Sequence, residues 1–193
     1  MRGFYEKVTV QSNGSGFHIL LDGKFAHTPL GQKLLLPSEI LAKEVAKELA
    51  AQSGKAKKQD MPLLKLVYTA QDAGHEGQQA LLEDLLRFST TDLLCYRASA
   101  PQALVERQNL LWDPILDWAG QYLGVHFAVY EGVCYGAQSE NTLIKIKLYL
   151  QAISCPFALV ALHNMTSLLG SVLLAIALFE QCFPLEEVWS LAH

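Results

Sequence analysis

The chain has 193 residues, a formal net charge of −4, and 51% apolar residues against 18% charged residues. This length is enough for one domain or two small ones with a buried core. The high apolar content excludes intrinsic disorder, which requires low hydrophobicity and high net charge. The acidic balance argues against nucleic-acid binding, because no excess of basic residues is present to contact phosphates.

Residues 4–36 have the pattern of short β-strands joined by turns. We expect strands at 5–10, 17–21, 24–28 and 33–36, with a turn at 13–16. Asp22-Gly23 is a two-residue hairpin signal between two of these strands. The sequence therefore predicts an N-terminal region rich in β-hairpins.

The rest of the chain has mainly helical spacing. Pro37-Ser38-Glu39 begins the first helix with Ser38 as its N-cap, and Leu41, Val45 and Leu49 form its buried stripe. Further helices are expected at 62–73, 76–88, 101–122, 141–151, 157–179 and from 184 to the end, with a short helical or extended element at 93–97 and a strand at 125–129. Asp113 and Pro114 are expected to divide the helix at 101–122 into two that meet at an angle. The predicted class is α+β: an N-terminal β-hairpin-rich domain with a helix at 1–60, then a mainly helical domain at 61–193.

The C-terminal part is almost free of charge. No Lys or Arg follows Lys147, and no charged residue lies between Leu148 and Phe179. A membrane helix requires about 20 consecutive apolar residues, whereas the longest apolar run is Val172–Phe179 and polar residues such as His163 interrupt the rest. We therefore predict buried core helices and no membrane span.

The four cysteines form no C-x-x-C pair. Cys95, Cys134, Cys155 and Cys182 are far apart in the sequence. This spacing matches neither a zinc site nor a redox motif, and a chain with its own core needs no disulfides. We expect buried free thiols and a reducing compartment.

Two sets of titratable residues are the candidates for catalysis. Asp113 and Asp117 lie one helical turn apart, and paired carboxylates can act as acid and base when burial raises one pKa. His163 can serve as a base, although a hydrogen-bonded core histidine is the commoner role. No nucleophile or metal-ligand motif accompanies them. The sequence therefore predicts no catalytic, cofactor-binding or metal-binding residue, with a small enzyme using His163 or Asp113/Asp117 as the alternative.

Polar and aromatic residues also interrupt the apolar pattern. Gln108 breaks an apolar helix face, Asp92 and Arg97 flank the sequence LLCY, and Trp112 and Trp118 lie in the same predicted helix. Trp and Arg are enriched at protein interfaces, which makes these residues candidates for contact with a partner. The alternative is that both tryptophans are core residues and that Asp92 pairs with Arg97.

These residues belong to motifs with a recognisable pattern. Residues 91–98 (TDLLCYRA), Gln108 and residues 112–118 (WDPILDW) resemble the ATP synthase assembly chaperones of mitochondria and alphaproteobacteria. Shorter matches follow in order along the chain, at 4–5, 21–23, 28–29, 36–39, 61–63, 131–133 and 162–171.

The resemblance implies a two-part protein that is not an enzyme and uses no cofactor. Its partner would be the unassembled alpha subunit of the F1-ATPase, whose subunit interface it would mask until the beta subunit takes that place. Such interfaces are apolar patches that aggregate when exposed. We expect a monomer in the bacterial cytoplasm or the mitochondrial matrix.

The motifs also give the candidate contact residues. The matching positions are Asp92, Arg97, Gln108, Trp112, Asp113, His163, Thr166 and Gly170. The family continues into an acidic and aromatic tail with a functional glutamate, which we expect this 193-residue chain to lack. Trp189 and Leu191 are then expected to be exposed, and Trp189 joins the candidate protein-binding residues.

Overall fold

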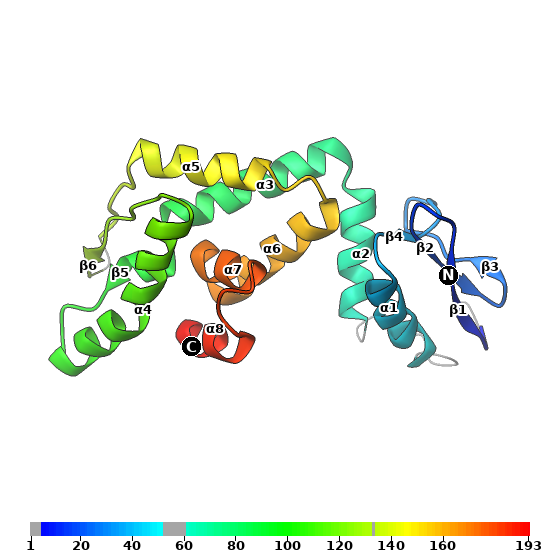
Figure 1. The fold of residues 1–193 in the computed structure, drawn as a ribbon, viewed down its shortest axis with the longest axis horizontal. Coiled ribbons are helices and arrows are strands. Elements are labelled where there is room, and N and C mark those ends of the chain that lie inside the picture. The colour runs from blue at the N-terminus through cyan, green and yellow to red at the C-terminus, as the bar shows by residue number, and fades with distance from the viewer. Residues whose placement is uncertain (1–4, 52–60, 133) are drawn as a thin grey trace. The chain divides into compact units, whose positions relative to one another are not determined.

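The computed structural model describes residues 5–51, 61–132 and 134–193, which form an α+β structure (Figure 1). The chain divides into two compact units, residues 1–75 and residues 76–193. We describe each unit by itself. The expected domain boundary after residue 60 falls at the end of a stretch outside the described residues, and it stays a prediction.

The first unit contains a small antiparallel sheet. Its strands are β1 (Val8–Ser12), β2 (Phe17–Leu21), β3 (Lys24–Phe25) and β4 (Leu35–Leu36). β1 pairs with one side of β2, while β3 and β4 pair with the other side at its two ends. Asp22 and Gly23 have φ values of 48° and 78°, as the predicted two-residue hairpin requires.

Two helices complete this unit. Helix α1 (Glu39–Ala51) packs on β1 and β2, and α2 (Pro62–Asp72) packs against α1. The predicted N-cap is confirmed, because Ser38 Oγ accepts a hydrogen bond of 3.3 Å from the Leu41 amide. The buried stripe of α1 is Ala42, Val45 and Leu49, whereas Leu41 is only half-buried.

The start of α2 is capped by a residue from α1. The Glu48 carboxylate accepts hydrogen bonds from the amides of Leu63 (3.0 Å) and Leu64 (2.9 Å). These two amides belong to the first turn, whose N–H groups have no partner inside the helix. Glu48 therefore fixes α2 against α1.

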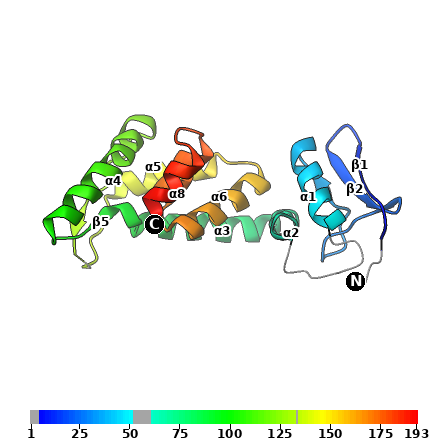
Figure 2. The same ribbon diagram turned by 90° about the horizontal axis from the view of Figure 1, so that it is seen from below.

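The second unit is mainly helical (Figures 1 and 2). Its elements are α3 (Gly74–Thr90), the 3₁₀ helix η2 (Leu93–Cys95), β5 (Tyr96–Arg97), α4 (Gln102–Tyr122), β6 (Tyr130–Glu131), α5 (Glu140–Gln151), α6 (Pro156–Leu169), α7 (Val172–Phe179) and α8 (Leu185–Ala192). The short element expected at 93–97 is thus helical and then extended, and β5 pairs in parallel with β6.

Helix α7 is the centre of the helical core. All residues from Val172 to Ala177 are buried, and α7 contacts α4, α6 and α8 (Figure 1). This confirms that the uncharged stretch forms core helices. Among the described residues, no helix has the length and apolarity needed to span a membrane.

The single helix expected at 157–179 is in fact two helices. Gly170 ends α6 in the left-handed conformation with φ of 67°, and its amide donates a hydrogen bond of 2.9 Å to the Thr166 carbonyl. Ser171 then caps α7, since its Oγ accepts a hydrogen bond from the Leu174 amide. Glycine adopts this conformation without the steric penalty of other residues, so the chain turns here.

The helix expected to break at Pro114 is continuous. Proline removes one backbone hydrogen bond, the one to the carbonyl four residues earlier. Pro114 and Leu110 are both exposed, and Leu110 retains 76% of its accessible surface. On this face water can satisfy the freed carbonyl, and α4 therefore continues from Gln102 to Tyr122.

The strand expected at 125–129 is absent, because side chains satisfy its backbone groups. The Gln138 amide group accepts a hydrogen bond from the Ala128 N–H (2.8 Å) and donates one to the Ala128 carbonyl (2.9 Å). The Thr142 hydroxyl donates to the His126 carbonyl at 2.8 Å. The segment therefore needs no neighbouring strand, and β6 begins only at Tyr130.

The expectation that the cysteines are buried free thiols is only partly correct. All four are free, but only Cys95 is buried, while Cys134 and Cys182 are exposed and Cys155 is intermediate. Burial raises the pKa of the Cys95 thiol to about 12, which keeps this thiol protonated and unreactive at neutral pH.

A glycine substitution at the end of α6 tests the need for positive φ there, and a second one inside α4 serves as its control. Gly170→Ala places a side chain at positive φ and is expected to lower the free energy of unfolding by about 1 kcal/mol. Gly120→Ala lies inside α4, where an added Cβ meets its nearest atom at an ordinary 3.5 Å, and is expected to be neutral or stabilising. Urea unfolding of both variants checks this, and equal destabilisation would contradict it.

Candidate functional site

The buried carboxylate of Asp92 joins three points of the helical unit. Its Oδ1 accepts a hydrogen bond from the Leu94 amide (3.0 Å), which caps η2. Its Oδ2 accepts from the Ser171 hydroxyl (3.0 Å) and the Leu173 amide (3.1 Å), at the start of α7. Burial raises the pKa of Asp92, and the hydrogen bonds that it accepts oppose the rise. Asp92 has no exposed surface, so its side chain acts inside the fold.

The guanidinium of Arg97 is also buried. Its Nε donates to the Leu94 carbonyl (2.9 Å), and one terminal nitrogen donates to Asn109 Oδ1 (3.0 Å). The other terminal nitrogen lies 2.9 Å from Asp113 Oδ1 as an ion pair, without the alignment of a hydrogen bond. The group also lies 5.2 Å from the ring centre of Trp112, within cation–π distance.

The alternative pairing of Asp92 with Arg97 is therefore wrong. Asp92 bonds to η2 and α7, whereas Arg97 bonds to α4. Both residues bond to the backbone of Leu94 in η2, but they do not pair with each other, and their remaining partners lie on different helices.

Two further motif residues tie α4 to its neighbours. Gln108 Oε1 accepts a hydrogen bond of 2.7 Å from the Ala98 amide, just after β5. The Trp112 indole N–H donates to the Leu191 carbonyl in α8 at 2.9 Å. Both side chains are half-buried, so they hold the fold while part of each stays accessible.

His163 makes a polar contact between α6 and α3. Its Nε2 lies 2.7 Å from Asp84 Oδ2, and Asp84 also pairs with Arg87. These contacts, the His163 hydrogen bond first, hold the pKa of Asp84 below its ordinary value. The expected hydrogen bond of His163 is confirmed, with a partner 79 residues away, but the side chain is only half-buried and does not lie in the core as expected.

The last two candidates have opposite environments. Thr166 is fully buried, and its hydroxyl has no hydrogen-bond partner among the described residues. Trp189 is 50% exposed and stacks on His193, with ring centres 4.1 Å apart. Leu191 is only 7% exposed, so its expected exposure is wrong.

The candidate catalytic groups do not come together. His163 contacts Asp84, Asp113 contacts Arg97, and Asp117 is exposed. The two surface grooves found in the described part of the chain contain none of His163, Asp113 and Asp117. Within that part, no group of three His, Cys, Asp or Glu residues could hold a metal ion.

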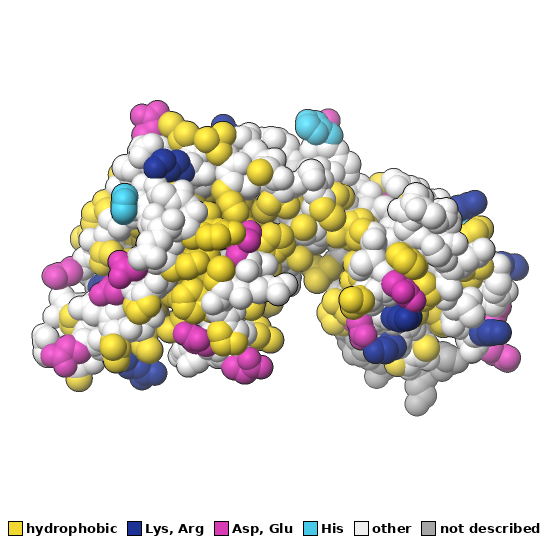
Figure 3. All heavy atoms as spheres, viewed as in Figure 1, with side chains coloured by type: hydrophobic (Ala, Val, Ile, Leu, Met, Phe, Trp, Pro, Cys, Tyr) yellow, Lys and Arg dark blue, Asp and Glu magenta, His cyan; other side chains and the backbone are white. Residues whose placement is uncertain are grey.

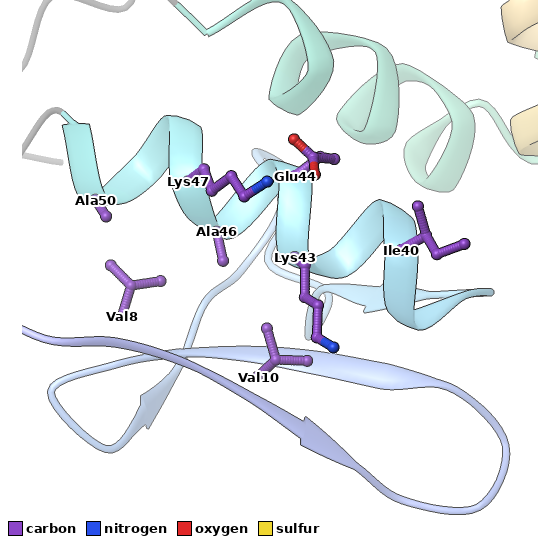
Figure 4. Close-up of a pocket in the computed structure, with 8 residues that line it drawn as sticks. All are labelled: Val8, Val10, Ile40, Lys43, Glu44, Ala46, Lys47 and Ala50. Atoms are coloured by element: carbon purple, nitrogen blue, oxygen red, sulfur yellow. Dashed lines mark hydrogen bonds and ion pairs between the residues drawn. The ribbon is translucent and has the colours of Figure 1, made fainter.

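A groove that the sequence did not indicate lies in the first unit, between β1 and α1 (Figure 4). It has a volume of about 450 Å³. Val8 and Val10 approach Ala46 and Ala50 of α1 across it, and Ile40 extends the apolar lining. The charged residues along it are Lys43, Glu44 and Lys47. The alternation of Val8 and Val10 predicted a strand, but no local signal showed that α1 leaves this space beside them.

The groove borders a free strand edge. β1 pairs only with β2 in the described residues, and the Lys7 carbonyl and Asn13 amide bond toward β2 and its turns. Antiparallel strands alternate their hydrogen bonds, so Thr9 and Gln11 also face β2, whereas the backbone groups of Val8 and Val10 point outward. An apolar lining beside unpaired backbone groups is the geometry that can take up an extended peptide.

Comparison with known proteins assigns the family. A family model described as ATP12 chaperone protein matches residues 2–120, more than half of the chain. The chain belongs to the ATP12 chaperone family. This assignment accounts for the motifs of residues 91–98 and 112–118, which lie within the matched region.

Solved structures agree with this family. Atp12 from Paracoccus denitrificans is 32% identical with a TM-score of 0.90, covering 98% of this chain and 81% of that one. The D202K mutant of the same protein gives a TM-score of 0.91 at 32% identity, covering 99% of this chain and 81% of the mutant. The Atu1473 protein from Agrobacterium tumefaciens, described as a candidate chaperone, is 46% identical with a TM-score of 0.92, covering 98% and 71%.

For an ATP12 family member, this geometry separates two kinds of motif residue. Asp92, Arg97 and Thr166 are buried, and the side chains of Asp92 and Arg97 bond within the helical unit. Gln108, Trp112, Asp113, His163 and Trp189 keep accessible surface. Contact of these five residues with a protein partner stays a prediction.

Removal of the Asp92 carboxylate is expected to destabilise the protein strongly. Asp92→Ala leaves the Leu94 amide, the Ser171 hydroxyl and the Leu173 amide without their acceptor in the core, and should cost about 3 kcal/mol or more. Asp117→Ala, at an exposed position of α4, should change stability by less than about 0.5 kcal/mol. Denaturant unfolding of the two variants measures both losses of stability. A loss for Asp92→Ala as small as that for Asp117→Ala would contradict the prediction.

The contact between Asp84 and His163 predicts a pH dependence. Because the folded-state pKa of Asp84 is lowered, its contribution to stability is present above the ordinary value of 3.8 and is lost as the pH falls through the lower folded-state value. Below about pH 4 the wild type should therefore lose stability more steeply than Asp84→Asn. Unfolding curves from pH 6 down to about pH 2.5 measure this, with Asp117→Asn as the exposed control. Parallel curves for wild type and Asp84→Asn would exclude the contribution.

Proposed function

We propose that this chain binds the unassembled alpha subunit of the F1-ATPase and masks the surface that the beta subunit later occupies. The observation that carries the proposal is the match of residues 2–120 to the ATP12 chaperone family. Under this proposal the protein is a non-enzymatic monomer of the bacterial cytoplasm or the mitochondrial matrix. The dispersed positions of His163, Asp113 and Asp117 support this over the alternative of a small enzyme.

The groove of the first unit supports the proposal. A subunit awaiting assembly exposes apolar segments that would otherwise aggregate. The free edge of β1 offers backbone groups to an extended segment, and Val8 and Val10 offer apolar contacts to every second side chain. We propose an extended alpha-subunit segment as the occupant. Lys43 and Lys47 pair with Glu39 and Glu44 on the surface of α1, and at 62% and 72% exposure they also remain open to acidic side chains of that segment.

Under this proposal, the chain releases the alpha subunit when another partner binds that subunit more tightly. A chaperone that binds only the unassembled subunit stabilises that state by mass action, and a partner that offers a better interface displaces it. Binding through a groove of limited size fits this requirement, because an obligate interface of large apolar area would hold the subunit permanently.

The test is a titration of aggregating alpha subunit with the purified chain. Wild type should suppress light scattering at near-stoichiometric amounts and should be retained with the subunit in a pull-down. Val10→Glu places a charge in the groove and should weaken binding about tenfold or more. Gln11→Glu adds the same charge at an exposed residue outside the groove and should bind like wild type.

Two results would count against the proposal. If wild type leaves aggregation unchanged across the titration, alpha-subunit binding is refuted. If Val10→Glu and Gln11→Glu bind equally well while both remain folded by circular dichroism, the groove is not the docking site.

A further inference from the structure

The second unit carries an uncompensated negative charge. Residues 76–193 contain five Lys and Arg against twelve Asp and Glu. Of these five basic residues, Arg87 and Arg97 already pair with Asp84 and Asp113 inside the unit. Residues 148–193 contain three glutamates and no Lys or Arg at all. A partner of this unit is therefore expected to present positive charge.

Glu180 is the one glutamate of this stretch that the structure holds in place with side chains. It follows α7 and is half-buried. The Tyr122 hydroxyl of α4 donates to Glu180 Oε2 at 2.7 Å, and the Tyr149 hydroxyl of α5 donates to Oε1. No ion pair of Glu180 is found among the described residues. Three helices thus fix a carboxylate that has no cation.

One of the two tyrosines that bond to this carboxylate, Tyr122, belongs to a cluster of aromatic rings. Trp118 stacks on Tyr122 with ring centres 5.3 Å apart, and it meets Phe183 edge-on at 6.0 Å. Tyr122 is 52% exposed, so part of its ring lies open to solvent beside Glu180. We call these five residues, Trp118, Tyr122, Tyr149, Glu180 and Phe183, the Glu180 patch.

We infer that the Glu180 patch is a docking site for an arginine side chain of the protein partner. Each carboxylate oxygen receives one tyrosine hydroxyl and keeps a further lone pair, so a planar guanidinium can bond to both oxygens. The same guanidinium can lie against the exposed Tyr122 ring, a contact that a lysine ammonium makes without bidentate geometry. The inference rests on the proposed function, because the partner is the alpha subunit.

The patch also provides fixed geometry before binding. Burial, followed by the Glu180 hydrogen bond, raises the pKa of Tyr149, and the hydrogen bond to Glu180 raises the pKa of Tyr122. Both hydroxyls therefore remain protonated donors at neutral pH. A carboxylate already held by two donors loses little conformational entropy on binding, which favours affinity at a small site.

The experiment compares two glutamates that carry the same charge. Glu180→Gln removes the charge within the patch, and Glu187→Gln removes it at an exposed position of α8. Binding to the alpha subunit, measured by titration calorimetry, should weaken about tenfold or more for Glu180→Gln and less than about twofold for Glu187→Gln. Tyr122→Leu keeps apolar contact with Trp118 but removes the ring and hydroxyl, and should weaken binding about threefold or more.

The outcomes separate the two proposals. If wild type fails to bind, the proposed function and this inference are both overturned. If wild type binds, and Glu180→Gln and Tyr122→Leu both bind within about twofold of Glu187→Gln, the Glu180 patch is excluded while alpha-subunit binding stands. Unfolding curves show that each variant is folded at the temperature of measurement. The salt dependence of binding should also be smaller for Glu180→Gln than for Glu187→Gln, because only the former removes the contacted charge.

Discussion

The helical unit depends on the buried carboxylate of Asp92. The first amides of a helix have no partner within it, and α7 begins in the core, where its first residues are shielded from solvent. Asp92 supplies an acceptor for the Leu173 amide, 81 residues away in sequence, and it caps η2 with its other oxygen. The three hydrogen bonds that Asp92 accepts and the positive end of the α7 dipole offset part of the cost of burying the carboxylate, whose pKa stays raised by burial. Without this contact, the most apolar helix of the chain would begin with unsatisfied donors in its core.

The sequence predicted a helix or strand correctly where a single local signal determined the structure. Asp22-Gly23 predicted the hairpin because both positions need positive φ, and the apolar run Val172–Phe179 predicted a core helix because it is too short for a membrane. The strand expected at 125–129 failed because distant side chains replace a local signal. Residues 125–129 have strand-like composition, yet Gln138 and Thr142 satisfy their backbone groups from outside any sheet.

The site was less predictable than the fold for the same reason. The sequence placed Asp92 and Arg97 on either side of four residues and suggested that they pair, whereas their partners come from α7 and α4. Asp84 could not be linked to His163 from spacing, since 79 residues separate them. The family motifs therefore indicated which residues matter without indicating what each one touches. The groove beside β1 left no signal in the sequence, because the space depends on how α1 crosses the sheet.

The placement of the motif residues bears on how a chaperone of this kind can bind and still release. The buried guanidinium of Arg97 bonds to Leu94 and Asn109 and pairs with Asp113, so these contacts hold the helical unit together. Under the proposed function, binding uses accessible surface, which in the helical unit includes acidic and hydrophobic side chains (Figure 3). Among them are the half-exposed Tyr122 and Trp189. Charged contacts at an exposed surface raise the rate of association more than they raise the affinity. Under the proposed function, a client held in this way would be captured quickly and displaced when a larger apolar interface becomes available.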